Sequence, residues 1–476
     1  MAGESATECT VGDVAAPSRN ALVGGPFGSD LVSRDYVPSG VPVIRGANMG
    51  HGRWVDGEFV YVTPEKADSL ASNCAKPGDL VFTQRGTLGQ VALVPKKGAD
   101  RYLISQSQMK VTLDPTKADA LFLYYVFISA EQQAYIVQNA ITTGVPHTNL
   151  GILRNTPLTL PPLAEQKAIA AVLGALDDKI ELNRRMNATL EAMARALFQS
   201  WFVDFDPVRR NLDRAANGKH KLPTLGKDPA ATFQSLELDA LFPAAFQDSA
   251  VGHIPLGWKV GVLDELTKFV IGGDWGATEP TDDETVSCYC IRGADIPSLQ
   301  SGGVGKMPTR FLKPSSIEKR QLADGDLAIE ISGGSPTQCT GRPVLASEAL
   351  LQNLGQPLVA SNFCRIVKLK SPALSKFVYL WLRRLYDAGE LFQFETGTTG
   401  IKNFAFVIFS EKYPVVVPDL RVAEAFDRAV SPFFARIQAN SQESRTLATL
   451  RDTLLPKLLS GELKTAAASA NVTVSA

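Results

Sequence analysis

The stretch Val43-Ile-Arg-Gly-Ala-Asn-Met49 occurs twice in this chain, because Cys290-Ile-Arg-Gly-Ala-Asp-Ile296 repeats its pattern. Pro77-Gly-Asp-Leu-Val-Phe82 follows the first block, and Asp324-Gly-Asp-Leu-Ala-Ile329 follows the second at the same offset. Blocks that recur in the same order at a constant offset indicate an internal duplication. The sequence therefore predicts two copies of one structural unit.

Further matched blocks extend the repeat in both directions. A Gly-Gly pair precedes each copy, at Gly24-Gly25 and at Gly272-Gly273. Near the end of each copy, three further segments match: Thr142-Thr-Gly-Val145 with Thr398-Thr-Gly-Ile401, Asn149-Leu150 with Asn403-Phe404, and Thr159-Leu-Pro-Pro-Leu163 with Val416-Val-Pro-Asp-Leu420. We expect each copy to end in a strand, a proline and a long helix.

The two expected helices show the spacing of a coiled-coil seam. In the first, the seam positions are Ile169, Leu173, Leu176, Ile180, Asn183, Asn187, Leu190, Ala194, Leu197 and Trp201. In the second, they are Phe426, Val430, Phe433, Ile437, Asn440, Ser444, Leu447, Arg451, Leu454 and Leu458. Such 4-3 spacing over several heptads predicts helix pairing. Each helix could instead pack only on its own domain, but two seams of similar length favour pairing with each other.

Two polar positions give the expected pairing its register. Asn183 and Asn440 occupy the same repeat position in otherwise apolar seams, and a buried asparagine selects partner and register. Pro432 is expected to kink or restart the second helix, with Ser431 as a possible N-cap. The prediction is an antiparallel coiled coil with an interruption at the proline.

The fold class follows as α+β, with two mixed α/β domains that are each followed by a long helix. Glycine, proline and β-forming residues dominate the two domains. The expected boundaries are 1–157 for the first domain, 158–208 for the central helix, 209–256 for a linker, 257–414 for the second domain, 415–462 for the C-terminal helix and 463–476 for a disordered tail.

Composition restricts the class of protein. Hydrophobic residues make up 45% and charged residues 20% of the 476 residues, as in soluble globular proteins. The apolar runs are too short to cross a membrane, and no secretion signal is visible at the N-terminus, so we expect a cytoplasmic protein. The net charge of −1 does not favour a lone DNA-binding protein. Phosphate contacts would need local basic patches or basic partner subunits.

Familiar catalytic motifs are missing from the sequence. It has no G-x-x-x-x-G-K-[ST] loop, no Asn-Pro-Pro-Tyr or Asp-Pro-Pro-Tyr segment and no G-x-G-x-x-G after a strand. The four histidines have no nucleophile pattern near them, and the six cysteines are scattered. Buried apolar thiols explain the cysteines better than a metal site does. We expect a chain without a catalytic centre and without a bound metal.

Polar residues that can contact DNA gather in the expected turns. Arginine, glutamine and asparagine can bond to base edges, and threonine and lysine suit phosphates. The candidates in the first copy are Arg45, Gln84, Arg85, Gln106, Gln108, Thr142, Thr143, His147 and Asn149. Those in the second are Arg292, Gln338, Arg342, Thr398, Thr399, Lys402 and Asn403. Each could instead be a solvated or turn-holding residue, and a structural ion pair is a competing role for Arg45 and Arg292.

Segments of both helices resemble the specificity subunits of type I restriction–modification systems. These segments are Leu160-Pro-Pro-Leu-Ala-Glu-Gln-Lys-Ala-Ile169, Leu176-Asp-Asp-Lys-Ile180, Leu197-Phe-Gln-Ser-Trp-Phe202 and Leu450-Arg-Asp-Thr-Leu-Leu-Pro-Lys-Leu-Leu-Ser-Gly-Glu462. Leu241-Phe-Pro and Ile254-Pro-Leu-Gly-Trp258 resemble the family's entry into its second domain. The resemblance covers almost the whole chain.

The resemblance implies a non-catalytic subunit with two target recognition domains, each of which reads one half of an interrupted, asymmetric sequence in double-stranded DNA. It implies that the helices set the spacer length and dock two modification subunits. S-adenosylmethionine would be bound by these subunits, and ATP and Mg²⁺ by restriction subunits. The helix positions expected to dock partners or set register are Glu165, Gln166, Ile180, Asn183, Leu190, Phe198, Trp201, Ile437, Asn440, Leu447 and Leu454.

The two copies depart from each other at two functional places. Gln84-Arg85-Gly86 is replaced by Ile331-Ser332-Gly333, and Glu165-Gln166 by Val422-Ala423. The readers are therefore expected to differ, and the two helix starts need not dock partners equally well.

Two other functions stay open at this point. One is a structural adaptor whose duplicated domains bind proteins, and the other is a nuclease or methyltransferase with an unrecognised site. Turnover by the purified chain, without partners, would favour the enzyme. We also expect the isolated chain to bind DNA weakly and the complex with modification subunits to bind it tightly.

Overall fold

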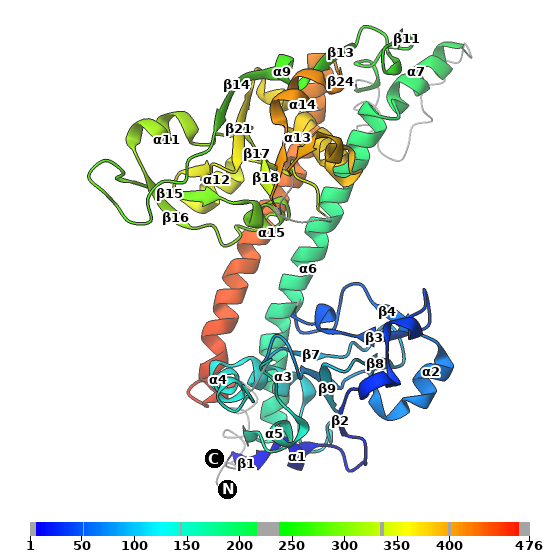
Figure 1. Ribbon diagram of the computed structural model, residues 1–476, viewed down its shortest axis with the longest axis vertical. Helices are drawn as coiled ribbons and strands as arrows, with labels where there is room; N and C mark the ends of the chain where they lie inside the picture. The colour runs from blue at the N-terminus through cyan, green and yellow to red at the C-terminus, as the bar shows by residue number, and fades with distance from the viewer. Residues whose placement is uncertain are drawn as a thin grey trace, which may run out of the picture. The chain divides into compact units, whose positions relative to one another are not determined.

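The computed structural model describes residues 6–50, 52–142, 145–216, 238–333, 338–397 and 401–465, in two compact units (Figure 1). Unit 1 contains residues 1–181 and 446–476, and unit 2 contains residues 182–445. Each unit holds one α/β domain together with part of each long helix, α6 (Leu163–Phe202) and α15 (Leu420–Leu459).

Two four-stranded sheets form the α/β domain of unit 1. The first is antiparallel and has the order β2 (Leu22–Gly24), β9 (Gln108–Val111), β6 (Leu80–Thr83), β7 (Val91–Leu93). The second has the order β4 (Val60–Val62), β3 (Val41–Ile44), β8 (Tyr102–Ile104), β5 (Cys74–Ala75), with β3 and β8 parallel. β1 (Thr7–Thr10) pairs with β10 (Pro157–Leu160). The helices are α1 (Val11–Val14), α2 (Pro64–Ser69), α3 (Ala120–Ile128), α4 (Ala130–Gln138) and α5 (Leu150–Arg154).

Unit 2 repeats this topology. Its antiparallel sheet has the order β14 (Thr267–Gly272), β21 (Cys364–Leu369), β17 (Leu327–Glu330), β19 (Pro343–Leu345). The second sheet has the order β16 (Thr309–Leu312), β15 (Val286–Ile291), β20 (Leu358–Ala360), with β15 and β20 parallel like β3 and β8. β13 (Lys259–Val262) pairs with β24 (Pro414–Val417), as β1 does with β10. The shared strand order confirms that the two domains are copies of one unit.

Further elements of unit 2 surround these sheets. A small sheet has the order β18 (Ser332–Gly333), β23 (Lys402–Phe404), β22 (Glu395–Thr396), and a hairpin joins β11 (Phe246–Ser249) to β12 (Gly252–Pro255). The other helices are α7 (Asp206–Ala216), α9 (Leu263–Leu266), α10 (Ile296–Gln300), α11 (Pro314–Arg320), α12 (Glu348–Leu354), α13 (Ser375–Asp387) and α14 (Phe406–Lys412). The residues expected to form the disordered tail begin at Leu463, and those from 466 onward lie outside the described residues.

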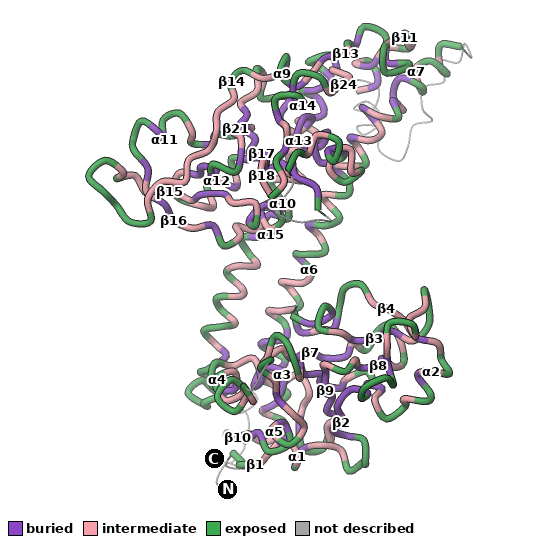
Figure 2. The backbone as a smooth tube through the Cα atoms, viewed as in Figure 1, coloured by how far each residue is buried: buried purple, intermediate pink, exposed green. Residues whose placement is uncertain are grey.

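The central strands are apolar on both faces because each separates two cores. In β6, Leu80 and Phe82 join the core that contains α3, while Val81 joins the core formed with the second sheet. In β17, Leu327 and Ile329 face one core and Ala328 faces the other. Alternate side chains of a strand point to opposite faces, so a strand covered on both sides reads as one apolar run. Figure 2 shows buried residues in the interior of each unit.

The two long helices pack as an antiparallel pair. In unit 2, Asn183 of α6 lies beside Asn440 and Ser444 of α15, and Asn187 lies beside Ser441. Residue numbers therefore increase along α6 in the direction in which they decrease along α15. In unit 1, leucines of α15 join Ile169 and Leu173 of α6 in the same core. The predicted antiparallel pairing is confirmed.

A buried layer of amides crosses the helix pair in unit 2. Nδ2 of Asn440 donates to Oδ1 of Asn187 (2.9 Å), and Nδ2 of Asn187 donates to Oγ of Ser441 (3.0 Å). Nδ2 of Asn183 donates to the carbonyl of Asn440 (3.2 Å) and to a carboxylate oxygen of Glu443 (2.9 Å). A shift of one helix turn would leave these buried amides without partners, and unpaired buried amides are costly. The layer therefore specifies the register of the pair.

The predicted restart of the helix at Pro432, with Ser431 as its N-cap, is wrong. α15 continues as one helix of 40 residues, and Ser431 is an interior residue whose hydroxyl donates to the carbonyl of Asp427 (2.6 Å). Pro432 is exposed, while Phe426 and Val430 before it are buried in the unit 2 core. Packing on the buried face keeps the helix continuous, although proline removes one backbone hydrogen bond.

The second glycine of each Gly-Gly pair is pressed against the neighbouring turn. A Cβ at Gly25 would overlap the carbonyl of Ser105, whereas a Cβ at Gly24 would meet only ordinary contacts at 3.7 Å. We expect Gly25→Ala to lower the free energy of unfolding by about 1–3 kcal/mol, because backbone must move to admit a methyl group. Gly24→Ala is the matched control and should stay within about 1 kcal/mol of wild type. Equal denaturation midpoints of the two variants in urea would contradict this packing.

The amide layer makes a second prediction. Asn187→Leu and Asn440→Leu should each lower the free energy of unfolding by about 1–3 kcal/mol, since each leaves a buried amide partner unsatisfied. The double variant should lose less than the two single losses combined, because both partners are then removed together. A double-mutant cycle by chemical denaturation measures this coupling, and strictly additive losses would show that the two amides do not interact.

Candidate nucleic-acid interface

Four segments of unit 1 meet at one edge of its antiparallel sheet. The backbone N–H groups of Gln84 and Arg85 donate to the carbonyl of Ser107 (2.6 and 3.4 Å). The N–H of Thr148 donates to the carbonyl of Gln84 (2.9 Å), and the N–H of Gly25 donates to the carbonyl of Gln108 (2.8 Å). We call this set the unit 1 loop edge; it consists of residues 25–31, 84–86, 105–107, 141–142 and 145–149.

The corresponding segments of unit 2 meet in the same way. The N–H of Ile331 donates to the carbonyl of Phe363 (2.9 Å), and the N–H of Phe404 donates to the carbonyl of Ile331 (2.9 Å). The N–H of Gly273 donates to the carbonyl of Cys364 (3.1 Å). The unit 2 loop edge consists of residues 273–276, 331–333, 361–363, 395–397 and 401–404.

These bonds correct one match made from the sequence. Thr148 and Phe404 make the equivalent bond, so His147 corresponds to Asn403, and the match of Asn149 with Asn403 is wrong. The two segments were misaligned because both contain asparagine before an apolar residue. Asn149 instead caps α5, where its side-chain oxygen accepts from the N–H of Ile152 (2.9 Å).

The matched arginines Arg45 and Arg292 have different partners. Arg292 forms an ion pair with buried Asp295, at 2.8 Å from Nε and 3.1 Å from a terminal nitrogen, and also donates to the carbonyl of Lys306 (2.6 Å). This carboxylate raises the pKa of Arg292. Unit 1 has Asn48 in place of Asp295, and its amide oxygen binds only the backbone N–H of Arg45 (3.0 Å).

Arg45 is consequently held loosely. One terminal nitrogen lies 3.5 Å from the carbonyl of Glu58, and its Nε is buried without a hydrogen-bond partner. Because an amide cannot neutralise a guanidinium, the charge of Arg45 is left available in unit 1. Among the described residues, the structural ion pair that competes with DNA binding is present for Arg292 and not for Arg45.

Three amide candidates of unit 1 hold turns. Nε2 of Gln106 donates to the carbonyls of Gly28 (2.6 Å) and Leu31 (3.1 Å). The amide of fully buried Gln108 donates to the carbonyl of Ile44 (3.2 Å) and accepts from the N–H of Gly46 (3.1 Å). Asn149 is the helix cap described above. Both polar groups of Gln108 are engaged within the domain, as are Nε2 of Gln106 and Oδ1 of Asn149.

Other candidates of unit 1 face solvent at the loop edge. Arg85 and Thr142 are exposed, Gln84 and His147 are half-buried, and Nδ1 of His147 lies 3.0 Å from the carbonyl of Val145. Arg85 makes no side-chain hydrogen bond or ion pair with the described residues. Arg85 and Arg45 are thus two available cations, and Thr143 lies outside the described residues.

The candidates of unit 2 are mostly engaged with neighbours. Arg342 forms a bidentate pair with buried Glu330 (2.7 and 2.5 Å). Lys402 pairs with Glu395 (2.9 Å) and lies over the ring of Phe392, while Oδ1 of Asn403 accepts from Ser332 (2.8 Å). Gln338 is exposed, and Thr398 and Thr399 lie outside the described residues.

At one equivalent position, unit 1 has a neutral polar pair and unit 2 has an ion pair. The N–H of Thr83 donates to the carbonyl of Gln90, and that of Glu330 donates to the carbonyl of Arg342, so the two pairs are equivalent. Unit 1 has a neutral pair here, with the Thr83 hydroxyl 3.1 Å from the Gln90 side-chain oxygen. Unit 2 has an ion pair at the same place. The sequence did not single out this pair, because its members are not adjacent in the chain.

Several expected docking residues of the long helices are buried in their own unit. The amide of Gln166 bonds to the N–H of Asp119 (3.0 Å) and to the carbonyls of Lys117 and Pro161. Phe198 and Trp201 belong to the unit 2 core. Glu165, Ile180, Leu190, Leu447 and Leu454 are half-buried, and Asn183, Ile437 and Asn440 are buried in the helix pair.

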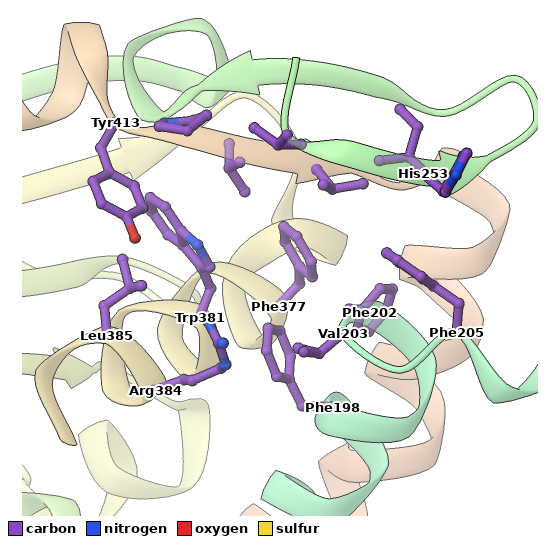
Figure 3. Close-up of a pocket in the computed structure, with 15 residues that line it drawn as sticks. Phe198, Phe202, Val203, Phe205, His253, Phe377, Trp381, Arg384, Leu385 and Tyr413 are labelled. Atoms are coloured by element: carbon purple, nitrogen blue, oxygen red, sulfur yellow. The ribbon is translucent and has the colours of Figure 1, made fainter. Parts of the chain in front are cut away.

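An aromatic pocket lies where α6 ends in unit 2 (Figure 3). Phe198, Phe202 and Phe205 line one side of it, and Phe377 and Trp381 of α13 line the other. Arg384 and His253 are the two ionisable nitrogen groups in its lining. The rest of the lining is mainly apolar and aromatic, and Nδ1 of His253 lies 2.9 Å from a carboxylate oxygen of Asp248, which is not among the lining residues.

All the cysteines are free thiols; Cys9 is half-buried and the other five are buried. Burial raises the pKa of Cys288 to about 11 and that of Cys290 to about 12. A thiol with a raised pKa is a poor nucleophile and a poor metal ligand. Among the described residues, no three histidine, cysteine or acidic side chains cluster as a metal site.

Comparisons with known proteins give the family context. Residues 40–192 match the model of the type I restriction modification DNA specificity domain. The chain is 23% identical to the type I restriction enzyme HindI specificity subunit of Haemophilus influenzae, over 91% of this chain and 97% of that protein. It is 24% identical to the MjaIX specificity subunit of Methanocaldococcus jannaschii, over 86% and 84% of the two chains.

A solved structure has the same fold. The S subunit of a type I restriction–modification system from M. genitalium superimposes with a TM-score of 0.51 at 17% identity, covering 96% of this chain and 97% of that one. No catalytic family is indicated by the matches. None of the helices in the described part of the chain has the length and apolarity needed to span a membrane.

Replacing the two matched arginines is expected to have different effects on stability. Arg292→Ala should lower the free energy of unfolding by about 1–2 kcal/mol, because it leaves the buried carboxylate of Asp295 without its guanidinium. Arg45→Ala is the matched control and should change it by less than about 0.5 kcal/mol. Thermal and urea denaturation measure both variants. An equal or larger loss for Arg45→Ala would show that Arg45 is also a structural residue.

Proposed function

Because this chain belongs to the family of specificity subunits of type I restriction–modification systems, we propose that its loop edges read the two halves of an interrupted, asymmetric DNA sequence. The observation that supports this most is the pair of loop edges, built from the same turns in the same arrangement. Turns positioned by a rigid sheet are common sites of recognition. Two such edges suit a target with two half-sites.

The two readers differ in chemistry, which suits an asymmetric target. The unit 1 loop edge presents Arg85, and Arg45 lies on the adjoining turn, where no carboxylate of the described part of the chain pairs with it. In unit 2, Ser332 replaces Arg85, and Arg292 is paired with Asp295. Arginine bonds bidentately to guanine and also binds phosphate. Unit 1 is therefore proposed to use more cationic contacts than unit 2.

Docking of modification subunits on the long helices is the second part of the proposal. Exposed apolar side chains occur along both helices: Val172, Leu182 and Met193 on α6, and Leu420 and Leu450 on α15. Half-exposed Glu165 lies in the first turn of α6, whereas Gln166 is used inside unit 1. Partner subunits would also supply the phosphate contacts that a chain of net charge −1 lacks.

Catalysis is proposed to belong to those partners. Adenine methylation with S-adenosylmethionine would take place on modification subunits, and ATP-driven translocation and Mg²⁺-dependent cleavage on restriction subunits. The side chains at the loop edges can donate and accept hydrogen bonds, but they include no nucleophile–base pair of the kind that catalysis needs. The chain is proposed to act as a non-catalytic subunit.

Domain exchange tests the reading role. Residues 1–157 would be replaced by the corresponding domain of another family member, and methylated adenines would be mapped genome-wide in a host carrying the intact system. One half-site should change and the other should stay the same, because each domain reads independently. The reciprocal exchange of residues 257–414 is the matched control and should change the other half-site.

Two outcomes would contradict the proposal. An unchanged methylation map after a folded exchange would favour the protein-binding adaptor. Methylation or cleavage by the purified chain alone, with S-adenosylmethionine, ATP and Mg²⁺, would favour an enzyme. In a salt titration, the isolated chain is expected to bind DNA weakly and non-selectively, and the complex with modification subunits tightly.

A further inference from the structure

Each loop edge exposes one large aromatic side chain. Phe27 of unit 1 is 83% exposed, and Phe363 of unit 2 is 53% exposed. Scattered exposed hydrophobic residues are normal on protein surfaces. These two differ from scattered residues because both lie among the turns proposed to contact DNA, one in each reader.

The backbone around Phe27 is held firmly while its ring is left in solvent. The side chain of Gln106 donates to the carbonyl of Gly28 (2.6 Å), and the N–H of Asp30 donates to the carbonyl of Phe27 (3.0 Å). Gly25, two residues earlier, is packed against the carbonyl of Ser105. Gln106 therefore serves to present Phe27, and a side chain on a fixed backbone loses little conformational entropy on binding.

Phe363 lies on a different turn, whose backbone is also held by hydrogen bonds while the phenyl ring stays exposed. Its carbonyl accepts from the N–H of Ile331 (2.9 Å), and the following N–H, of Cys364, donates to the carbonyl of Ser361 (2.9 Å). The backbone of this turn is thus bonded on both sides of the residue. The phenyl ring remains exposed although the chain around it is fixed.

The exposed aromatic residue lies at a different, non-equivalent position in each unit. The position of Phe27 corresponds to Trp275 in unit 2, where the guanidinium of Arg310 covers the indole at 4.0 Å and its Nε donates to the Trp275 carbonyl (3.1 Å). The position of Phe363 corresponds to Ser107 in unit 1. One ring per edge is therefore available, but at different places, as two readers of unlike sequences require.

A second apolar residue accompanies each ring at equivalent positions. Val145 in unit 1 is 66% exposed and Ile401 in unit 2 is 60% exposed. Val145 lies two residues before His147, and Ile401 lies two residues before Asn403, which are equivalent by their backbone bonds. Both edges thus combine polar side chains with exposed apolar groups.

We propose that Phe27 and Val145 in unit 1, and Phe363 and Ile401 in unit 2, contact the C5-methyl groups of thymines and so contribute to sequence selection. This inference rests on the proposed function. Thymine methyl is the apolar group that a base pair shows in the major groove, and apolar side chains recognise it. Single apolar residues set among polar ones suit base contacts better than a protein partner, which needs a contiguous apolar patch.

The experiment uses the complex with modification subunits and the DNA target mapped for the wild type. A half-site that contains a methylated adenine also contains the thymine paired with it. Binding is measured on duplexes in which single thymines are replaced by deoxyuridine, which removes the methyl group and keeps the base pair. Phe27→Ala and Phe363→Ala are compared with wild type on every duplex.

We expect Phe27→Ala to weaken binding to the natural duplex by about three- to tenfold, as the loss of one buried methyl contact would. Deoxyuridine at the contacted thymine should weaken wild-type binding to a similar extent and cause no further loss in Phe27→Ala. Phe363→Ala should show the same dependence in the other half-site only. Genome-wide methylation in Phe27→Ala should become less selective at the corresponding position.

Two exposed apolar residues away from the edges provide controls. Val137→Ala on α4 removes a side chain that is 62% exposed, and Phe269→Ala on β14 removes one that is 42% exposed. Neither variant should change binding or methylation. Thermal unfolding of all four variants should stay close to wild type, since every altered side chain is exposed.

The inference is overturned if Phe27→Ala and Phe363→Ala bind and methylate as wild type does, or if deoxyuridine weakens them as much as wild type. Loss of assembly with modification subunits, without a change in DNA selectivity, would make these residues protein contacts and also overturn it. If domain exchange changes a half-site while the alanine variants do not, the proposed function stands and only this inference fails. An unchanged half-site after domain exchange is instead a failure of the proposed function.

Discussion

In each unit, a close contact between the backbones of two turns, with no side chain between them, fixes the position of the loop edge. Gly25 packs against the carbonyl of Ser105, and Gly273 packs against the carbonyls of Ala360 and Ser361, so closely that any Cβ would overlap them. This contact brings the turn after the first sheet strand against the turn that connects the two sheets. The latter turn then accepts the N–H groups that follow the central strand. The arrangement of candidate DNA-contacting residues depends on this one close approach.

On that common frame, the two units differ through exchanged polar partners. Asn48 in unit 1 stands where unit 2 has Asp295, and this single difference decides whether the matched arginine is neutralised. The neutral pair of Thr83 and Gln90 likewise becomes the ion pair of Glu330 and Arg342. Changes of this kind alter the charge that a surface presents without altering the backbone. They explain how one architecture can present two unlike surfaces at the edges proposed to read DNA.

The helices were predicted well because their signal is local and repeated. The spacing of seam residues placed them at 158–208 and 415–462, and the structure has α6 and α15 inside these ranges. Pro432 misled the prediction because the local cost of a proline is smaller than the packing of Phe426 and Val430 on the opposite face. Among the candidate site residues, Gln106, Gln108 and Asn149 have the chemistry of base readers but hold turns. Their role depends on which carbonyl or N–H lies in reach, and no sequence spacing records that.

The sequence by itself determined that this chain is a duplication, that each copy ends in a long helix, and that an asparagine layer lies in their seam. These properties are written in periodicity and in matched blocks, so they can be read along the chain. Tertiary structure decided which charged side chains meet across strands and which apolar side chains remain exposed. Arg342, beside β19, pairs with Glu330 of β17, and neither local segment records this pairing. Trp275 is covered because Arg310, from a distant strand, lies over its ring, whereas no residue in the described part of the chain covers Phe27 in this way.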